Sequence, residues 1–269
     1  MTKIKNFIKQ SVADFKKVPS WLVGLSVVTV VLMNILANKG LFASGNLALD
    51  SGFLISWVMF LVMDIVTQRY GGKASFAVTV FDVGVALFMA LLMFGIAQIP
   101  ETATSGWMLG EEASNALNNV IGNSILVVLV SLLAFVVASI IDIISNVTVG
   151  KWLGKSKTFK GEDKKRTVKG FFVYFTRAYS STFLSQLADN IVFQLIAYNF
   201  LFNWFYDPDF VGNAPGAMLG NSQAQLALLT GALVGAVAEL IMELAFAPIG
   251  YFTITKKLEQ TELNLKKEA

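Results

Sequence analysis

One stretch of the chain, Arg177–Phe193 (RAYSSTFLSQLADNIVF), places charged and hydrogen-bonding side chains inside a segment that is otherwise apolar. Arg177, Ser181, Ser185 and Asp189 follow one another at intervals of four residues, so on an α-helix they form one stripe. Such side chains bind ligands, or each other, through charge and hydrogen bonds. The chain contains no His and no Cys, which excludes disulfides, Ser–His and Cys–His nucleophiles and the usual zinc sites.

Other apolar segments are also interrupted by polar residues. A charge at the centre of a bilayer costs from about 2.5 kcal/mol upward, so charged residues there are candidates for function. We interpret them as the lining of a polar internal cavity, in preference to hydrogen bonds that only join helices. The polar residues of these segments are Asn34, Asp64, Gln68, Asp82, Asp142, Arg177, Gln186, Asp189, Asn190, Gln194, Glu239 and Glu243.

The composition indicates which elements must carry these residues. Hydrophobic residues make up 55% of the 269-residue chain, charged residues only 14%, and the mean hydropathy is +0.63, whereas soluble domains carry about 25% charged residues. A helix needs roughly 20 apolar residues to cross about 30 Å of hydrocarbon. The apolar runs are too long for barrel strands, so we predict an all-α integral membrane protein with one domain, residues 1–269. The six predicted spans are about 21–41, 46–68, 74–97, 120–148, 172–204 and 223–253.

The basic residues predict the orientation of these spans. Eight Lys and Arg residues fill the loop 151–169, whereas the loops 99–119 and 205–222 contain none. Basic loops stay on the cytoplasmic side. We therefore predict that the protein lies in a bacterial cytoplasmic (inner) membrane, with both termini on the cytoplasmic side. The basic residues behind the formal charge of +3 then face the cytoplasm and the lipid headgroups. We therefore expect no nucleic-acid partner. The Gly-Lys-Ser of the basic loop lacks the first glycine of a phosphate loop, which would fall at Val149, so we expect no ATP site and no cofactor.

Depth along the predicted spans separates the polar residues into groups. Asp64 and Arg177 fall near the cytoplasmic side, where we predict an ion pair, with Gln68 and Ser181 as further gating residues. Asn34 and Asp189 fall at or beyond the midplane, and the two glutamates of span six near mid-depth. We therefore predict a cavity lined by spans one, five and six and closed from the cytoplasm by the Asp64 end of span two. Asp142, at the cytoplasmic end of span four, is interpreted as a snorkelling side chain.

Three motifs resemble those of one family. NILANKG (Asn34–Gly40) is similar to its first-helix Asn and Lys, and LVMDIVTQRYGGKAS (Leu61–Ser75) resembles its Asp-Ile-x-x-Glu-x-Tyr-Gly signature. Arg177–Phe193 resembles its Arg-x-x-x-Ser-Thr-x-x-x-Gln-x-x-Asp-x-x-x-Phe signature. The family is that of the queuosine precursor transporters, also called the vitamin uptake transporter family.

The resemblance implies uptake of the 7-deazaguanine precursors of queuosine, preQ0 and preQ1. It also implies a fold like the substrate-binding subunits of vitamin-type importers. The sequence departs from the family pattern at Gln68, where Glu is usual, at Asn146, where Asp is expected, and at Glu239 and Glu243. The polar residues carried over by position are Asn34, Lys39, Asp64, Gln68, Tyr70, Arg177, Ser181, Thr182, Gln186 and Asp189.

A deazapurine presents N–H groups and a carbonyl, which carboxylates and amides can pair with, and a flat ring that an aromatic side chain can stack on. The predicted substrate-binding residues are Asn34, Gln186, Asp189, Asn190, Phe193, Glu239 and Glu243. Transport of another nucleobase or a vitamin-like heterocycle stays open, as does a role as the substrate-binding subunit of an ATP-driven importer. An enzyme is not expected, because the paired carboxylates have no nucleophile nearby. The small-residue run Gly231–Gly235 allows a homodimer, although packing within the bundle is the simpler interpretation.

Overall fold

The computed structural model describes residues 2–37, 39–44, 47–99, 111–153, 168–196, 230 and 232–253. The predicted loop 205–222, most of the basic loop 151–169 and the last residues of the chain lie outside this part. The described helices are α1 (Thr2–Phe15), α2 (Ser20–Leu36), α3 (Phe53–Tyr70), α4 (Gly72–Ala97), α5 (Glu111–Trp152), α6 (Val168–Ile196) and a last helix, Ala232–Thr253. Two strands, β1 (Gly40–Ser44) and β2 (Leu47–Asp50), form an antiparallel hairpin between α2 and α3.

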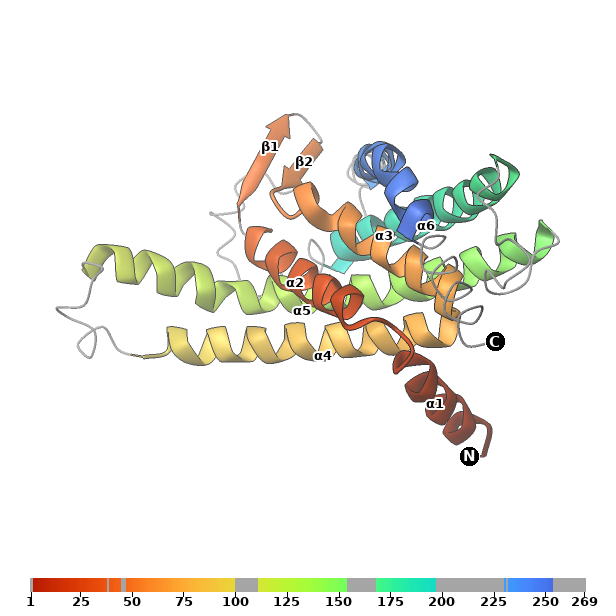
Figure 1. The fold of residues 1–269 in the computed structure, drawn as a ribbon. Coiled ribbons are helices and arrows are strands. Elements are labelled where there is room, and N and C mark those ends of the chain that lie inside the picture. Colours follow the sequence, from red (N-terminus) through yellow and green to blue (C-terminus); the bar gives the residue numbers. More distant parts are fainter. Residues whose placement is uncertain are drawn as a thin grey trace.

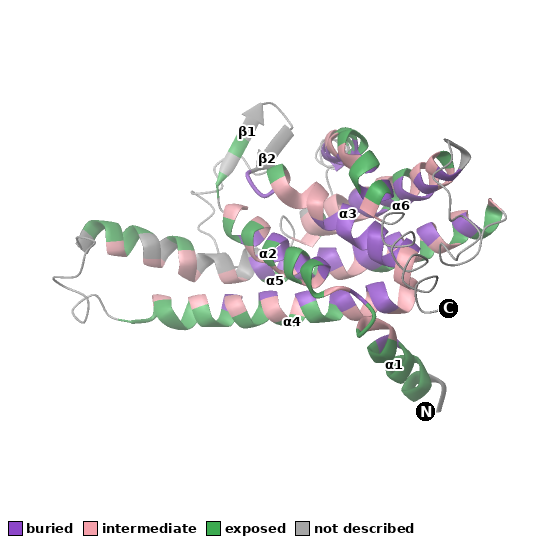
Figure 2. Cartoon of the chain, in the orientation of Figure 1, coloured by how far each residue is buried: buried purple, intermediate pink, exposed green. Residues whose placement is uncertain are grey.

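The long helices α4 and α5 lie side by side, and α2, α3 and α6 lie along one side of this pair (Figure 1). The most extensive helix contacts join α5 to α6 and α4 to α5. Helix α3 is the central element, because every residue from Met59 to Gln68 is buried (Figure 2). A helix that is buried all round must have its polar side chains satisfied by its neighbours. The polar residues of α3 therefore determine where the functional chemistry lies.

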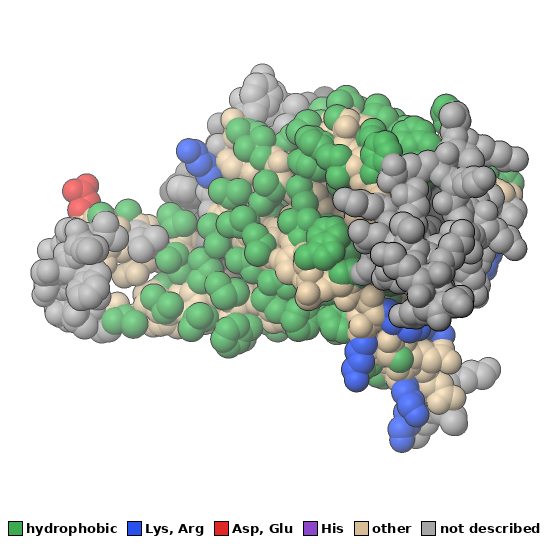
Figure 3. Space-filling view, in the orientation of Figure 1, with side chains coloured by type: hydrophobic (Ala, Val, Ile, Leu, Met, Phe, Trp, Pro, Cys, Tyr) green, Lys and Arg blue, Asp and Glu red, His purple; other side chains and the backbone are tan. Residues whose placement is uncertain are grey.

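Apolar side chains cover much of the outer surface. Figure 3 shows them over α4 and α5, with lysines gathered at α1. Four helices are long and apolar enough to span a membrane: α3, α4, Val128–Trp152 within α5, and Ala232–Thr253. Helix α2 has 17 residues, about 26 Å, and could span only as part of a bent pair with α1. The structure thus supports a multi-pass membrane protein with four or five spans among the described residues, and the count of six stays a prediction.

The hairpin corrects the sequence prediction at the first two spans. Span one was predicted to reach residue 41, but α2 ends at Leu36, and span two was predicted to begin at 46, but α3 begins at Phe53. The apolar residues between these helices pair as strands instead. The backbone N–H and the hydroxyl of Ser51 both donate to the carbonyl of Lys39, at 2.7 and 2.9 Å, and close the base of the hairpin. Hydropathy alone cannot separate short strands from the end of a helix.

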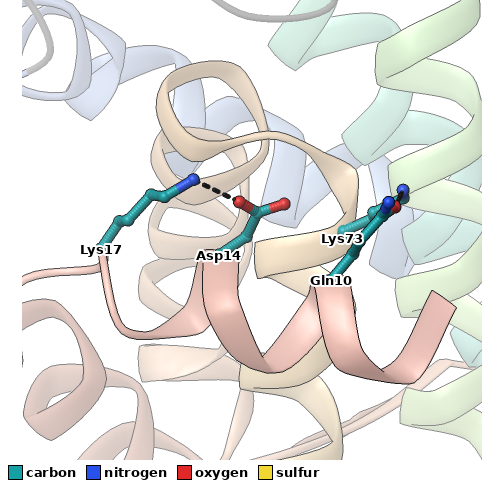
Figure 4. Close-up of polar contacts among 4 residues, drawn as sticks. All are labelled: Gln10, Asp14, Lys17 and Lys73. Carbon is teal, nitrogen blue, oxygen red and sulfur yellow. Dashed lines mark hydrogen bonds and ion pairs between the residues drawn. The ribbon is translucent and has the colours of Figure 1, made fainter. Parts of the chain in front are cut away.

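Helix α1 leaves the bundle at an angle of 104° to α2. It contacts the beginning of α4, where Lys73 donates a hydrogen bond to Gln10 (Figure 4). The Lys73 ammonium also lies 5.9 Å from the centre of the Phe7 ring. At the end of α1, Lys17 forms an ion pair of 2.6 Å with Asp14 (Figure 4). The basic N-terminal segment is therefore a helix of its own, sharply bent from α2 and held against α4.

The turn between α3 and α4 depends on one glycine, and this generates a prediction. Gly71 has φ 93° and ψ 159°, a conformation that is essentially restricted to glycine. We expect Gly71→Ala to destabilise the protein by about 1–3 kcal/mol, seen as a lower apparent melting temperature in detergent. Gly84→Ala is the control, because Gly84 lies within α4 and a Cβ there would meet no atom within 4 Å. Equal melting temperatures for the two variants would contradict this assignment.

The predicted orientation can be tested at the two ends of α5, since the chain has no native cysteine. Glu112 and Lys151 are both exposed and lie at opposite ends of this helix. If both termini are cytoplasmic, the cysteine introduced by Glu112→Cys reacts with a membrane-impermeant maleimide added to intact spheroplasts. A cysteine at Lys151→Cys then reacts only after the membrane is permeabilised. The opposite labelling pattern would reverse the topology.

Candidate functional site

A buried chain of hydrogen bonds joins α3, α5 and α6. The side chain of Asn146 on α5 donates through Nδ2 to Asp64 Oδ1 on α3, at 2.6 Å. Its Oδ1 accepts from Arg177 on α6, from Nε at 3.2 Å and from Nη2 at 2.9 Å. All three side chains have 0% relative exposure. One neutral amide thus links a carboxylate and a guanidinium across three helices.

The polar stripe of α6 supplies two more donors to Asp64. The hydroxyl of Ser181 lies 3.1 Å from Asp64 Oδ1, and that of Thr182 lies 3.4 Å from Oδ2. Two acidic side chains complete this group. The carboxyl of Glu243, on the last helix, lies next to that of Asp64, and Asp142 of α5 lies beside them. We call this group the acidic cluster; it consists of Asp64, Asp142, Asn146, Arg177, Ser181, Thr182 and Glu243.

A close helix approach makes room for the guanidinium. A Cβ on Gly150 of α5 would lie 2.8 Å from Arg177 Cζ and 2.9 Å from its Nε. Non-bonded carbon atoms do not approach this closely, so only glycine fits at this position without moving the arginine. Gly150 follows Asn146 by four residues and lies on the same face of α5. That face therefore both binds Arg177 and accommodates it.

A second polar layer lies further along α6. Gln186 is 1% exposed, and neither its Oε1 nor its Nε2 has a hydrogen-bond partner among the described residues. Asn190 donates to the Gln186 backbone carbonyl at 3.0 Å. On the neighbouring helices, the hydroxyl of Ser56 donates to Glu239 Oε1 at 2.5 Å. We call Ser56, Gln186, Asn190 and Glu239 the amide layer.

The contacts between α6 and the last helix place these residues at one level. Thr182 approaches Glu243, and the Asn190 Oδ1 lies 3.2 Å from the position of a Cβ on Gly235. The two helices therefore run antiparallel, with matching steps of eight residues. Midway between these contacts, Gln186 and Glu239 fall opposite each other. The amide layer is thus one helical turn, about 6 Å, from the acidic cluster.

The remaining predicted residues lie on α2, α3 and α6. Gln68 donates to the backbone carbonyl of Tyr174 at 3.5 Å and is buried. Asp189 and Phe193, on α6, are both half-buried. Asn34 donates to the Val30 carbonyl at 2.7 Å. It also lines a cavity of about 20 Å³, room for about one water, between α2, α4 and α5.

The structure changes three assignments made from the sequence. Asp64 and Arg177 do not form the direct ion pair that was predicted, because Asn146 lies between them. Glu243 was predicted to bind the substrate and Asp64 to act at the gate. The two side chains contact each other, so both belong to the acidic cluster. Asp142 is fully buried, so the prediction that it snorkels toward the interface is wrong. Helical periodicity gives the face of each residue but not which helix that face meets.

Sequence reasoning did not assign a role to Asn146 or Tyr174. Both are fully buried, and Tyr174 lies close enough to Asp64 and Glu243 to interact with their charges. A signal was present for each of them. Asn146 follows Asp142 by four residues, and Tyr174 precedes Arg177 by three, so both share a helical face with a buried charge.

A helical membrane bundle with buried charges at its centre is typical of transporters. Comparison with protein families gives one match, over residues 50–253, to the family described as "Putative vitamin uptake transporter". The chain belongs to this family, which confirms the resemblance seen in its motifs and favours transport over catalysis. Searches of curated proteins and of solved structures found no match.

The bridging role of Asn146 generates a prediction. Asn146→Leu keeps the size of the side chain but leaves Asp64 and Arg177 without their link, and breaking a buried charge network typically costs about 3 kcal/mol or more. We expect a clear drop in the apparent melting temperature in detergent. Asn115→Leu is the control, because Asn115 lies on the same helix and is exposed. An unchanged melting temperature for Asn146→Leu would show that the bridge does not hold the helices together.

Proposed function

We propose that the protein imports 7-deazaguanine precursors of queuosine, preQ0 or preQ1, and binds them at the amide layer. One observation carries this proposal: the buried amide of Gln186, whose donor and acceptor atoms both lack a partner among the described residues. A buried amide without partners is costly, and native structures usually have a reason for one. A ligand with a matching donor and acceptor is such a reason.

The chemistry of a deazaguanine fits this amide. Its lactam edge offers a ring N–H beside a carbonyl, so one amide can accept from the first and donate to the second. Asp189 follows Gln186 by three residues on α6, and Glu239 lies opposite it. Carboxylates accept hydrogen bonds from amino groups and attract the aminomethyl cation of preQ1. Phe193 provides an aromatic ring one further turn along α6.

The acidic cluster suits the role of an inner gate. It ties α3, α5, α6 and the last helix together through side chains alone, one turn from the amide layer. In alternating access, one group of helices moves against another around a fixed site. Exchange of hydrogen-bond partners within the cluster would open and close the cytoplasmic side.

The test is uptake of labelled preQ1 by cells that cannot make queuosine precursors and that express this chain. We expect Gln186→Leu to lower uptake at limiting substrate roughly tenfold or more, because each 1.4 kcal/mol of lost hydrogen bonding changes affinity tenfold. Gln98→Leu is the matched control, since Gln98 is exposed at the end of α4. Uptake that is the same in both variants would remove Gln186 from the site.

The same assay, with purified protein in liposomes, separates the other candidates. If guanine or a vitamin is taken up and preQ0 and preQ1 are not, the transport function stands and the proposed substrate is wrong. Transport that requires added ATPase subunits would make the chain the substrate-binding part of an ATP-driven importer.

A further inference from the structure

The contact between the carboxyl groups of Asp64 and Glu243 is the most unusual interaction in the described structure. Asp64 and Asp142 have 0% relative exposure, and Glu243 has 3%. Two ionised carboxylates in contact, away from water, repel each other strongly. The contact is stable only if the pair holds a proton between its oxygens, as paired carboxylates in other proteins do.

The hydrogen bonds favour one member of the pair as the holder of the proton. Asp64 accepts from Asn146, Ser181 and Thr182. In contrast, both oxygens of Glu243 lack a donor among the described residues. Thr182 also lies near Glu243, but the hydrogen bond that its hydroxyl forms in the structure is the 3.4 Å contact to Asp64 Oδ2. Hydrogen bonds to a carboxylate stabilise its charged form, which favours the negative charge on Asp64 and the proton on Glu243.

The charges facing the cluster support the same distribution. They are Asp64 from α3, Asp142 from α5, Arg177 from α6 and Glu243 from the last helix, with the Tyr174 hydroxyl beside them. If every acid were ionised, three negative charges would face one guanidinium. Both Asp142 oxygens also lack a donor among the described residues.

We propose that Glu243 and Asp64 form a proton site that is loaded and emptied in each cycle, so that import is driven by the proton gradient. This rests on the proposed transport function and adds its energy source. Glu243 and Asp64 belong to different helices, so a movement that separates the last helix from α3 removes the like charge and the shared hydrogen bond. The proton on Glu243 then passes to water on the cytoplasmic side, and an outside proton replaces it when the helices return. One proton enters with the substrate, and no bond other than O–H is made or broken.

The proton site is tested first without any substrate. The purified protein at pH 7 should show the infrared carbonyl band of a protonated carboxylic acid, which a carboxylate does not give. We expect this band to lose intensity in Glu243→Gln and to be unchanged in Glu112→Gln, whose carboxyl is exposed. Asp64→Asn gives a second variant of the same contact and should shift the band by removing the acceptor. A band of equal intensity in Glu243→Gln and the unmodified protein would overturn the proposal, whatever the substrate is.

Coupling is tested next with labelled preQ1 in liposomes of the purified chain. With the unmodified protein, an acidic outside medium should raise the final concentration of labelled preQ1 inside the liposomes several-fold, compared with equal pH on both sides. A protonophore should abolish this difference. In Glu243→Gln, the final level should not depend on the gradient. A gradient effect that persists in Glu243→Gln, or that requires sodium instead of protons, would overturn the proposal. If preQ1 does not enter at all, the proposed substrate fails, and the infrared result still decides the proton site.

Discussion

The link from Asp64 through Asn146 to Arg177 is the interaction on which the rest of the structure depends. A buried charge is tolerated only when it is paired and hydrogen-bonded, and each end of this link lies on a different helix. The positions of α3, α5 and α6 are therefore set by polar contacts at the centre, while their apolar outer surfaces adapt to lipid. Lipid tails are as apolar as the side chains that face them, so apolar burial alone does not align membrane helices.

The surrounding residues follow from this requirement. Gly150 is small because the guanidinium occupies the space that a Cβ would need. Ser181 and Thr182 are short hydroxyl residues that reach the carboxylate of Asp64 from the helix next to it. The stripe on α6 is thus not a single functional surface. Its first half, Arg177 to Thr182, contacts Asn146 and Asp64, whereas Gln186 in its second half has an amide that no described residue uses.

The helical membrane class and the family could be predicted from the sequence, whereas the hydrogen-bond partners of the buried polar residues could not. Long apolar runs and the basic loops determine the helical membrane class, and three motifs indicate the family, because these signals are local. The bridging position of Asn146 and the contact of Glu243 with Asp64 depend on which helix faces meet, and a spacing of four residues carries no such information. The hairpin between α2 and α3 was missed for another reason, since its short strands are also largely apolar and follow an apolar helix directly.

A bridge through a neutral amide has a mechanical consequence for a transporter. A direct Arg–carboxylate pair in a dry interior is short, bidentate and strongly destabilising to break, because both charges lose their partner together. In this protein Asp64 accepts three hydrogen bonds from two helices, from Asn146, Ser181 and Thr182, whereas Arg177 donates to the one oxygen of Asn146. One bond can be exchanged while the others hold, so the helices can move past one another in steps. The network thus fixes one arrangement of the bundle through contacts that can be exchanged one at a time.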